Sequence, residues 1–277
     1  MSAARPTERE TLLAQVAGYL EWEEQLGGSG IPRGVPPTRE ATTEARSVTP
    51  AQPAPRPAPS VPPGGLTLAP TETAGERSGL SALALSLPVA SGGDARLRLA
   101  QLDEQVRACT GCELHKGRRQ TVFARGNPES KLVFVGEGPG QEEDRSGQPF
   151  VGPAGQLLDK MVAAMGLHRD DVYICNVVKC RPPGNRTPLP SEAGACAPFL
   201  LGQIDAIAPK VLVALGRCAA ENMGLVDAGT WRGRWGRFRG VEVMPTYHPA
   251  FLLRSPEYKR PVWEDLQKVM ARLRELG

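Results

Sequence analysis

The chain of 277 residues lacks any apolar run of the roughly 18 residues that a helix needs to cross a membrane. Its first residues also lack a basic head followed by an apolar stretch, so we expect no secretory signal. Its six cysteines have spacings typical of metal ligands and not of a disulfide scaffold, which suits a reducing compartment. We therefore expect a soluble cytoplasmic protein that does not bind membranes.

Two nucleotide-binding patterns are missing as well. The glycine turn at residues 136–140, GEGPG, lacks the Lys-Ser/Thr pair of a P-loop. Its glycines also do not follow the G-x-G-x-x-G spacing of a dinucleotide-binding turn. The sequence therefore predicts neither of these two protein classes.

Charge and proline divide the chain into two parts. Residues 1–95 carry 7 Lys and Arg against 10 Asp and Glu, a net charge of −3. Residues 96–277 carry 26 against 20, a net charge of +6. A basic excess in the second part is expected of a protein that meets a phosphate backbone, although an ordinary solvated surface would give the same charge.

The first part of the chain shows one helical pattern and one linker pattern. A capping box from Thr7 to Glu10 precedes apolar residues on one helical face, which predicts an amphipathic helix over residues 1–27. This helix would dock on its own domain or on a repair-protein partner. Of the 27 prolines, 12 lie between residues 27 and 90, so we expect a Pro-rich disordered linker over residues 28–93.

From residue 94 onward, short apolar runs alternate with helical patterns. The predicted strands are at residues 131–135, 172–177, 210–215 and 241–245. The predicted helices are at 94–108, 154–165, 191–207 (interrupted near Pro198) and 261–276, with a further short helix that follows the third strand and ends at residue 223. This alternation predicts an α/β fold, a three-layer α/β/α sandwich with a central four-stranded, mainly parallel sheet. Ligands of such sheets bind beyond the carboxyl ends of the strands, where the glycine turn, Asn176 and His248 are expected.

Four cysteines have the spacing of a metal centre. Two residues separate Cys109 from Cys112, and fifteen separate Cys180 from Cys196. A C-x2-C pair can bind one metal centre from a single turn, and four sulfurs complete either a zinc site or an iron–sulfur cluster. The span from Cys112 to Cys180 is too long for a zinc finger, which favours the cluster and leaves zinc as the alternative.

Four motifs now stand in order along the chain: GEGPG at residues 136–140, QPFVG at 148–152, CNVVKCRPP at 175–183 and YHPA at 247–250. Together with the cysteines they resemble the family 4 uracil-DNA glycosylases, over the chain from about residue 100 to its end. The resemblance implies a glycosylase domain at residues 94–277 with a 4Fe-4S cluster bound by the four cysteines. It also implies excision of flipped uracil from DNA, the first step of base excision repair, by a protein that we expect to be a monomer.

The resemblance assigns three residues to the base. Phe150 would stack on uracil, Asn176 would read its edge, and His248 would donate to O2 as negative charge builds there. An Asn amide offers an acceptor for N3–H and a donor for O4, whereas cytosine presents the reverse pattern. Whether His248 acts as a neutral or a charged imidazole is left open.

Other uracil-glycosylase families place a water-activating Asp in the first glycine motif. The matching position here is Gly138, so the resemblance suggests that stabilisation of the leaving group carries most of the catalysis. Glu137 would orient the loop or the water, and Glu143 would block the methyl group of thymine. Both glutamates are equally compatible with solvated loop acids.

Basic side chains near these motifs are candidates for DNA contact. The candidates are Arg254, Lys179, Arg181 and Arg186, with a second cluster at Arg232, Arg234, Arg237 and Arg239, although charge runs are usually only solvated faces. The alternative function is a non-catalytic uracil- or DNA-binding module with a structural metal centre. One variant within the resembling superfamily forms a covalent link to DNA through a His in a basic insertion after the second strand. We do not expect this chain to be that variant, because no Arg-Arg-Ile-His-like segment lies between Lys179 and Ser191.

Overall fold

The computed structural model describes residues 94–226 and 231–277, together with Ala17 and Leu20, which are helical and exposed. The helix predicted over residues 1–27 and the linker predicted over 28–93 otherwise lie outside the described residues, so both stay predictions. No helix among the described residues is long and apolar enough to cross a membrane.

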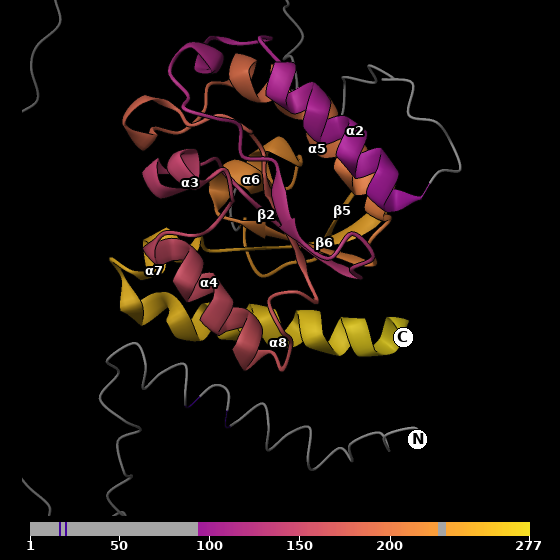
Figure 1. Ribbon diagram of the computed structural model, residues 1–277. Helices are drawn as coiled ribbons and strands as arrows, with labels where there is room; N and C mark the ends of the chain where they lie inside the picture. Colours follow the sequence, from indigo (N-terminus) through magenta and orange to yellow (C-terminus); the bar gives the residue numbers. More distant parts are fainter. Residues whose placement is uncertain (1–16, 18–19, 21–93, 227–230) are drawn as a thin grey trace, which may run out of the picture. The chain divides into compact units, whose positions relative to one another are not determined.

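One six-stranded sheet forms the centre of the described domain (Figure 1). Its strands, in the order β1-β3-β2-β4-β6-β5, are β1 Ala124–Gly126, β3 Tyr173–Asn176, β2 Leu132–Gly136, β4 Val211–Leu215, β6 Val241–Thr246 and β5 Gly236–Phe238. The four central strands are parallel and correspond to the four predicted ones, whereas β1 and β5 pair antiparallel at the two edges. The predicted number of four strands is therefore wrong, because two short, partly exposed edge strands carry no continuous apolar run.

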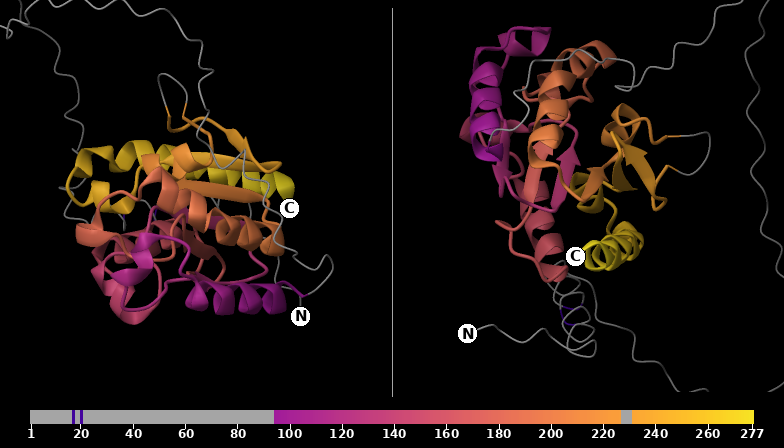
Figure 2. Two further views of the ribbon diagram at one scale, coloured as in Figure 1. Left: turned by 90° about the horizontal axis from the view of Figure 1, so that it is seen from above. Right: turned by 90° about the vertical axis from the view of Figure 1, so that its right-hand side faces the viewer.

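Helices cover both faces of the sheet, as the sandwich prediction requires (Figures 1 and 2). On one face lie α2 Ala95–Ala108, α5 Pro190–Ile207 and α6 Arg217–Asn222, and on the other lie α4 Pro153–Ala164, α7 Pro249–Leu252 and α8 Lys259–Leu276. Successive residues of β2 alternate between the two cores, Val133 facing the first and Phe134 the second. Strands buried on both faces are apolar throughout, which is why the central strands were visible in the sequence.

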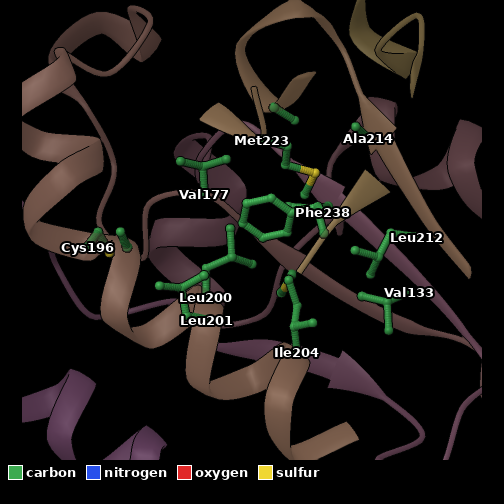
Figure 3. Close-up of a cluster of buried hydrophobic side chains, with 14 of the residues drawn as sticks. Val133, Val177, Cys196, Leu200, Leu201, Ile204, Leu212, Ala214, Met223 and Phe238 are labelled. Carbon is green, nitrogen blue, oxygen red and sulfur yellow. The ribbon is translucent and has the colours of Figure 1, made fainter. Parts of the chain in front are cut away.

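The core between α5 and the sheet also reaches the cysteines. Figure 3 shows Leu200 and Ile204 of α5 in one buried cluster with Phe238 of β5 and with Val133 and Leu212 of the central strands. Cys196 lies on the same helix and belongs to the same buried cluster. The helix that packs the core therefore also carries a candidate metal ligand.

Helix α5 does not break at Pro198, contrary to the sequence prediction. A proline removes one backbone donor, and the buried face of this helix extends on both sides of it. Other elements not predicted are short: α3 Gln141–Ser146, α7 and the 3-10 turns Glu113–Lys116, Pro183–Asn185 and Pro256–Tyr258. All of these except Pro256–Tyr258 contribute lining residues to one of the two cavities described below.

Candidate functional site

A cavity of about 600 Å³ opens at the carboxyl ends of the parallel strands. The glycine turn follows β2, Asn176 ends β3, and His248 follows β6, so one edge of the sheet brings together three distant segments. The residues singled out in the sequence that line this cavity are Glu137, Gly138, Glu143, Phe150, Asn176, Arg186, His248 and Arg254. The structure thus places all three base-contacting candidates in a single pocket.

Asn176 presents an unused acceptor to this pocket. The residue is 1% exposed, and its Oδ1 is buried without a hydrogen-bond partner among the described residues. A buried acceptor without a partner is rare in folded proteins and points to a group that a ligand completes. The side chain packs against Gly136, where a Cβ atom would lie 2.4 Å from Oδ1. A glycine at the end of β2 is therefore what lets the amide approach.

Phe150 packs against the same glycine. A Cβ on Gly136 would also come within 2.5 Å of its Cζ. The backbone of Phe150 adopts φ 55°, a left-handed conformation that is unusual for an aromatic residue and typical of strained functional loops. The α4 residue Gly155 supports it, because a Cβ there would lie 1.8 Å from the Phe150 carbonyl oxygen. The ring is thereby held 5.6 Å from the His248 ring, centroid to centroid.

His248 is the N-cap of α7 and is held as a neutral donor. Its Nδ1 accepts a hydrogen bond from the backbone N–H of Ala250, at 3.1 Å, so its proton resides on Nε2. Burial, and after it the positive charge of Arg254, lower the pKa of the imidazole to about 4, while the negative charge of Glu143 opposes both. Burial therefore favours the neutral imidazole, one of the two forms that the sequence left open.

Glu143 joins the two glycine-rich loops. Its Oε1 accepts the backbone N–H groups of Val151 and Gly152, both at 2.9 Å, and its Oε2 accepts that of Gly140 at 3.1 Å. A carboxylate that accepts three backbone donors holds those loops in a fixed relation. The alternative of a solvated loop acid is therefore wrong for Glu143.

The first glycine motif has little room for an Asp at its third position. A Cβ on Gly138 would lie 2.8 Å from the Val178 side chain, so a larger residue would displace Val178. The neighbouring Glu137 lines the pocket, and burial raises the pKa of its carboxyl, against a hydrogen bond with Thr187 that lowers it. Glu137 is the carboxyl of this motif that faces the cavity.

Lys179 does not lie on a DNA path, contrary to the sequence prediction. It is 1% exposed, and its Nζ donates to the Asn176 carbonyl oxygen and to Gln203 Oε1, both at 2.6 Å. A side chain enclosed in this way cannot reach a phosphate backbone. Arg254, by contrast, is exposed at the pocket, while Arg181 is only partly exposed and donates to Asn185 Oδ1 at 2.7 Å.

The remaining arginine candidates are largely paired with acids. Arg186 lines the pocket and forms a two-pronged ion pair with Glu192, at 2.7 and 2.8 Å. In the second cluster, the acidic partners are Asp265 for Arg232, Glu242 for Arg237 and Asp205 for Arg239. Arg232 also stands 5.0 Å from the centre of the Tyr247 ring. These pairs offset much of the positive charge that the sequence offered for DNA contact.

The four cysteines line a second, smaller cavity. Cys109 caps the end of α2, Cys112 begins the following 3-10 turn, Cys180 follows β3, and Cys196 lies in α5. Three of the sulfurs accept hydrogen bonds, and the donors are Gly111 N to Cys109 at 3.4 Å, Arg118 Nη1 to Cys180 at 3.2 Å and Lys179 N to Cys196 at 3.3 Å. Donors of this kind stabilise anionic sulfur ligands.

The six cysteines form no disulfides among the described residues. Within the described residues, no three His, Cys, Asp or Glu side chains converge on a position for a single metal ion. Four Cys sulfurs can bind either zinc or an iron–sulfur cluster. Burial raises the pKa of the Cys196 thiol to about 12, so loss of its proton at neutral pH would accompany metal binding.

Sequence reasoning missed two neighbours of the cysteine cavity. Arg118 donates to the Cys180 sulfur and to the carbonyl oxygen of Cys109, at 2.8 Å, and so ties the two cysteine segments together. His115 is partly buried, lines the cavity and contacts the Cys112 carbonyl oxygen through Nδ1 at 2.7 Å. Nothing in the spacing of either residue marks it in the sequence.

Known proteins are similar to this chain in sequence. The family description "Uracil DNA glycosylase superfamily" matches residues 123–267, which include the six strands of the sheet and the residues that line the larger cavity. The fold and the pocket thus define a member of that superfamily. Relatives include a Type-4 uracil-DNA glycosylase of Thermotoga maritima, 48% identical over 184 residues, which cover 64% of this chain and 95% of the relative.

A second Type-4 uracil-DNA glycosylase, from Archaeoglobus fulgidus, is 42% identical over 186 residues, covering 62% of this chain and 92% of the relative. A Type-5 uracil-DNA glycosylase of Pyrobaculum aerophilum is 33% identical over 144 residues, which cover 45% of this chain and 63% of that protein. The chain belongs to the type-4 uracil-DNA glycosylase family, as the four sequence motifs predicted.

Proposed function

We propose that this protein is a uracil-DNA glycosylase, an enzyme that hydrolyses the N-glycosidic bond of uracil in DNA and leaves an abasic site for base excision repair. The observation that carries the proposal is the Asn176 Oδ1 atom, a buried acceptor without a partner, beside Phe150 in the pocket. Uracil turned out of the helix would supply the missing donor, its N3–H. Family membership supports the same reaction.

Recognition in this proposal depends on the two ends of the Asn176 amide. Oδ1 accepts from uracil N3–H, and Nδ2 donates to O4. Cytosine has an acceptor at N3 and a donor at N4, so both pairs would fail and leave buried polar groups unsatisfied. Phe150 provides the stacking surface for uracil. Glu143 fixes the loop that holds Phe150, and it would block the methyl group of thymine.

Catalysis in this proposal stabilises the departing base. The bond between C1′ and N1 breaks, uracil leaves as an anion, and a water oxygen bonds to C1′ while its proton passes to solvent or to the base. His248 donates Nε2–H to O2, where negative charge builds, and it remains a neutral donor throughout. Fixed donors at such a position lower the barrier without reorganisation. Glu137 orients the water or the loop that encloses it.

For the cysteine centre we propose a 4Fe-4S cluster bound by Cys109, Cys112, Cys180 and Cys196. Two buried and two partly buried cysteines around one cavity, three of them accepting N–H donors at sulfur, suit that group. When bound, the cluster would join the end of α2, the segment after β3 and α5. Thiols that must stay reduced favour the cytoplasm as the compartment.

DNA contact is assigned to the exposed side of the pocket. Arg254 and Arg186 line its wall and are placed to meet phosphates on either side of the flipped nucleotide, and Arg181 lies beside them in sequence. We do not assign DNA contact to Lys179, because its side chain is buried. Action as a monomer, and binding of a repair protein by residues 1–27, remain proposals that rest on the sequence alone.

The decisive test is excision by the full-length protein, purified anaerobically with its metal content measured. Matched oligonucleotides carry uracil, cytosine or thymine at one position, as single strands and as duplexes, and alkali reveals abasic sites. Cleavage confined to uracil supports the proposal. Binding of uracil DNA without any cleavage would instead support the non-catalytic binding module.

A variant tests the role of the amide directly. Asn176→Asp replaces the donor end of the side chain with an acceptor, which should weaken selection of uracil by about 1–3 kcal/mol. The measurement is the ratio of excision rates for uracil and cytosine, with metal content confirmed. An unchanged ratio would remove Asn176 from base reading.

A further inference from the structure

Lys179 is a buried cation without an anionic side-chain partner. It is 1% exposed, and the acceptors of its Nζ are the Asn176 carbonyl oxygen and the Gln203 amide oxygen. Within residues 94–226 and 231–277, no carboxylate forms an ion pair with it. Burial of a charge is costly unless a nearby group of opposite charge compensates it. The structure therefore calls for a negative partner close to this ammonium group.

The cysteine centre is the neighbour that can supply this negative charge. Lys179 lines the small cavity with all four cysteines and immediately precedes Cys180 in the chain. Its backbone N–H donates to the Cys196 sulfur at 3.3 Å, and its positive charge acts on the same sulfur. Four thiolates around iron carry a net negative charge, and nearby charges and hydrogen bonds set the reduction potential of such a centre.

The same lysine also holds the backbone of the residue proposed to read uracil. The side chain of Asn176 has a free Oδ1, so hydrogen bonds to that atom do not fix the position of the amide before a base arrives. The carbonyl oxygen of Asn176 is instead held by the Lys179 ammonium at 2.6 Å, a charge-assisted bond in a buried site. Gln203, the other acceptor, lies on α5 together with Cys196.

We infer that Lys179 is a positioning residue that couples the cysteine centre to Asn176, because its charge offsets the sulfur ligands while its side chain fixes the carbonyl of the base-reading residue. The inference rests on the proposed function for both the cluster and the uracil pocket. Lys179 touches neither the base nor the reacting bond, and it acts through Asn176. The coupling would explain a lysine at a position with no access to solvent.

The test compares Lys179→Met with Lys116→Met in the full-length, metal-loaded protein. Methionine removes the charge and the donors at similar length, and Lys116 is an exposed lysine near Cys112, paired only with Glu113. The readouts are iron per chain, the reduction potential of the cluster by voltammetry, and the dissociation constant for DNA with a non-cleavable uracil analogue.

For Lys179→Met we expect retained iron and a lower reduction potential, because loss of a positive charge disfavours the added electron. We also expect analogue binding to weaken about tenfold, as for loss of one buried charge-assisted hydrogen bond. Lys116→Met should match the wild type in all three readouts. A Lys179→Met protein with its iron and with unchanged potential, or with unchanged analogue binding, overturns the coupling.

If Lys179→Met does not fold, a second variant tests whether the charge of Lys179 affects the reduction potential. Gln203→Glu places a carboxylate against the ammonium and neutralises its charge, while the bond to the Asn176 carbonyl remains. The potential should then fall with analogue binding kept within about twofold. An unchanged potential overturns the inference. A wild-type protein that cannot excise uracil contradicts the proposed function itself, whereas an active wild type beside unaltered variants contradicts only the role of Lys179.

Discussion

The backbone N–H of Ala250 donates a hydrogen bond to Nδ1 of His248 over 3.1 Å. An imidazole nitrogen that accepts a hydrogen bond carries no proton, so the other ring nitrogen is the donor. The turn that begins α7 therefore selects the tautomer that offers Nε2–H to the pocket. Burial acts in the same direction, since it disfavours the imidazolium form.

The first prediction follows from this neutral histidine. The folded-state pKa of His248, about 4, lies below the ordinary value of 6.5. Between these values the unfolded chain binds a proton that the folded chain does not, so this residue should reduce stability as pH falls through that window. Nitrogen NMR of labelled histidines should show the Nε2–H form of His248 at neutral pH. A titration midpoint for His248 near the ordinary value of 6.5 would contradict the prediction.

The second prediction separates catalysis from binding. His248 is proposed to act on charge that is present mainly in the transition state, so His248→Ala should lower the single-turnover excision rate by roughly 10²–10³-fold. Binding to a non-cleavable uracil analogue should change far less. His168→Ala, at a side chain that is 72% exposed, is the matched control. An unchanged rate in an intact His248→Ala protein would remove this residue from the reaction.

The third prediction concerns the close approach at the end of β2. A methyl group on Gly136 would lie within 2.5 Å of both the Asn176 Oδ1 and the Phe150 ring, and the pocket must shift to admit it. Displacement of a positioned group by about 1 Å can lower a rate about 10²-fold, which is the loss we expect for Gly136→Ala in single-turnover excision.

A helix glycine provides the control for that variant. Gly194 lies in α5, and a Cβ there would meet no atom within 4 Å. Gly194→Ala should therefore keep full activity and stabilise the helix by about 1 kcal/mol at most. Equal activity of the two variants would show that the approach at Gly136 is not needed.

The fourth prediction addresses the metal. Anaerobically purified protein should be brown and contain about four irons per chain. Replacement of Cys109 or Cys196 by Ser should impair folding more than the chemistry of the protein that does fold, since these ligands join separate segments. Cys218→Ala changes a buried cysteine in α6, outside the cysteine cavity, and should keep its iron. Stoichiometric zinc without iron would contradict the cluster.

The fifth prediction concerns the domain boundary. Asp94 caps α2 by accepting the backbone N–H of Arg96, and the described domain begins there. A chain that starts near Asp94 should fold, bind its metal and retain most uracil excision, because all lining residues of both cavities lie after it. A truncated protein with its metal but without activity would show that the first 93 residues take part in catalysis.

The sequence predicted the central strands because these are buried on both faces and therefore apolar without interruption, as in β4. The edge strands β1 and β5 were not predicted, because each spans only three residues, some of them exposed, and so has no continuous apolar run. The pocket residues were located from motifs at strand ends, and the parallel topology does bring those ends together. The motifs could not predict the hydrogen-bond partners that determine the tautomer and the orientation of each side chain.

Lys179 shows the limit of sequence reasoning most clearly. A lysine between Val178 and Cys180 carries a charge, and charge in a basic domain was interpreted as DNA contact. Its burial depends on α5, whose Gln203 lies far away in the chain. The tautomer of His248 and the three donors on Glu143 depend in the same way on loop geometry. Such contacts are properties of the folded chain and leave no spacing signal.

The four cysteines lie on both sides of the segment that forms β1, β2 and β3. During synthesis, the first pair emerges long before Cys196, which is part of α5. A nascent chain that ends before this helix holds only a partial set of ligands and cannot complete the centre. A centre bound by all four would also close a long loop, a contribution that a partly made or unfolded chain loses. Metal loading would therefore report that the domain has been completed, and metal release would accompany its unfolding.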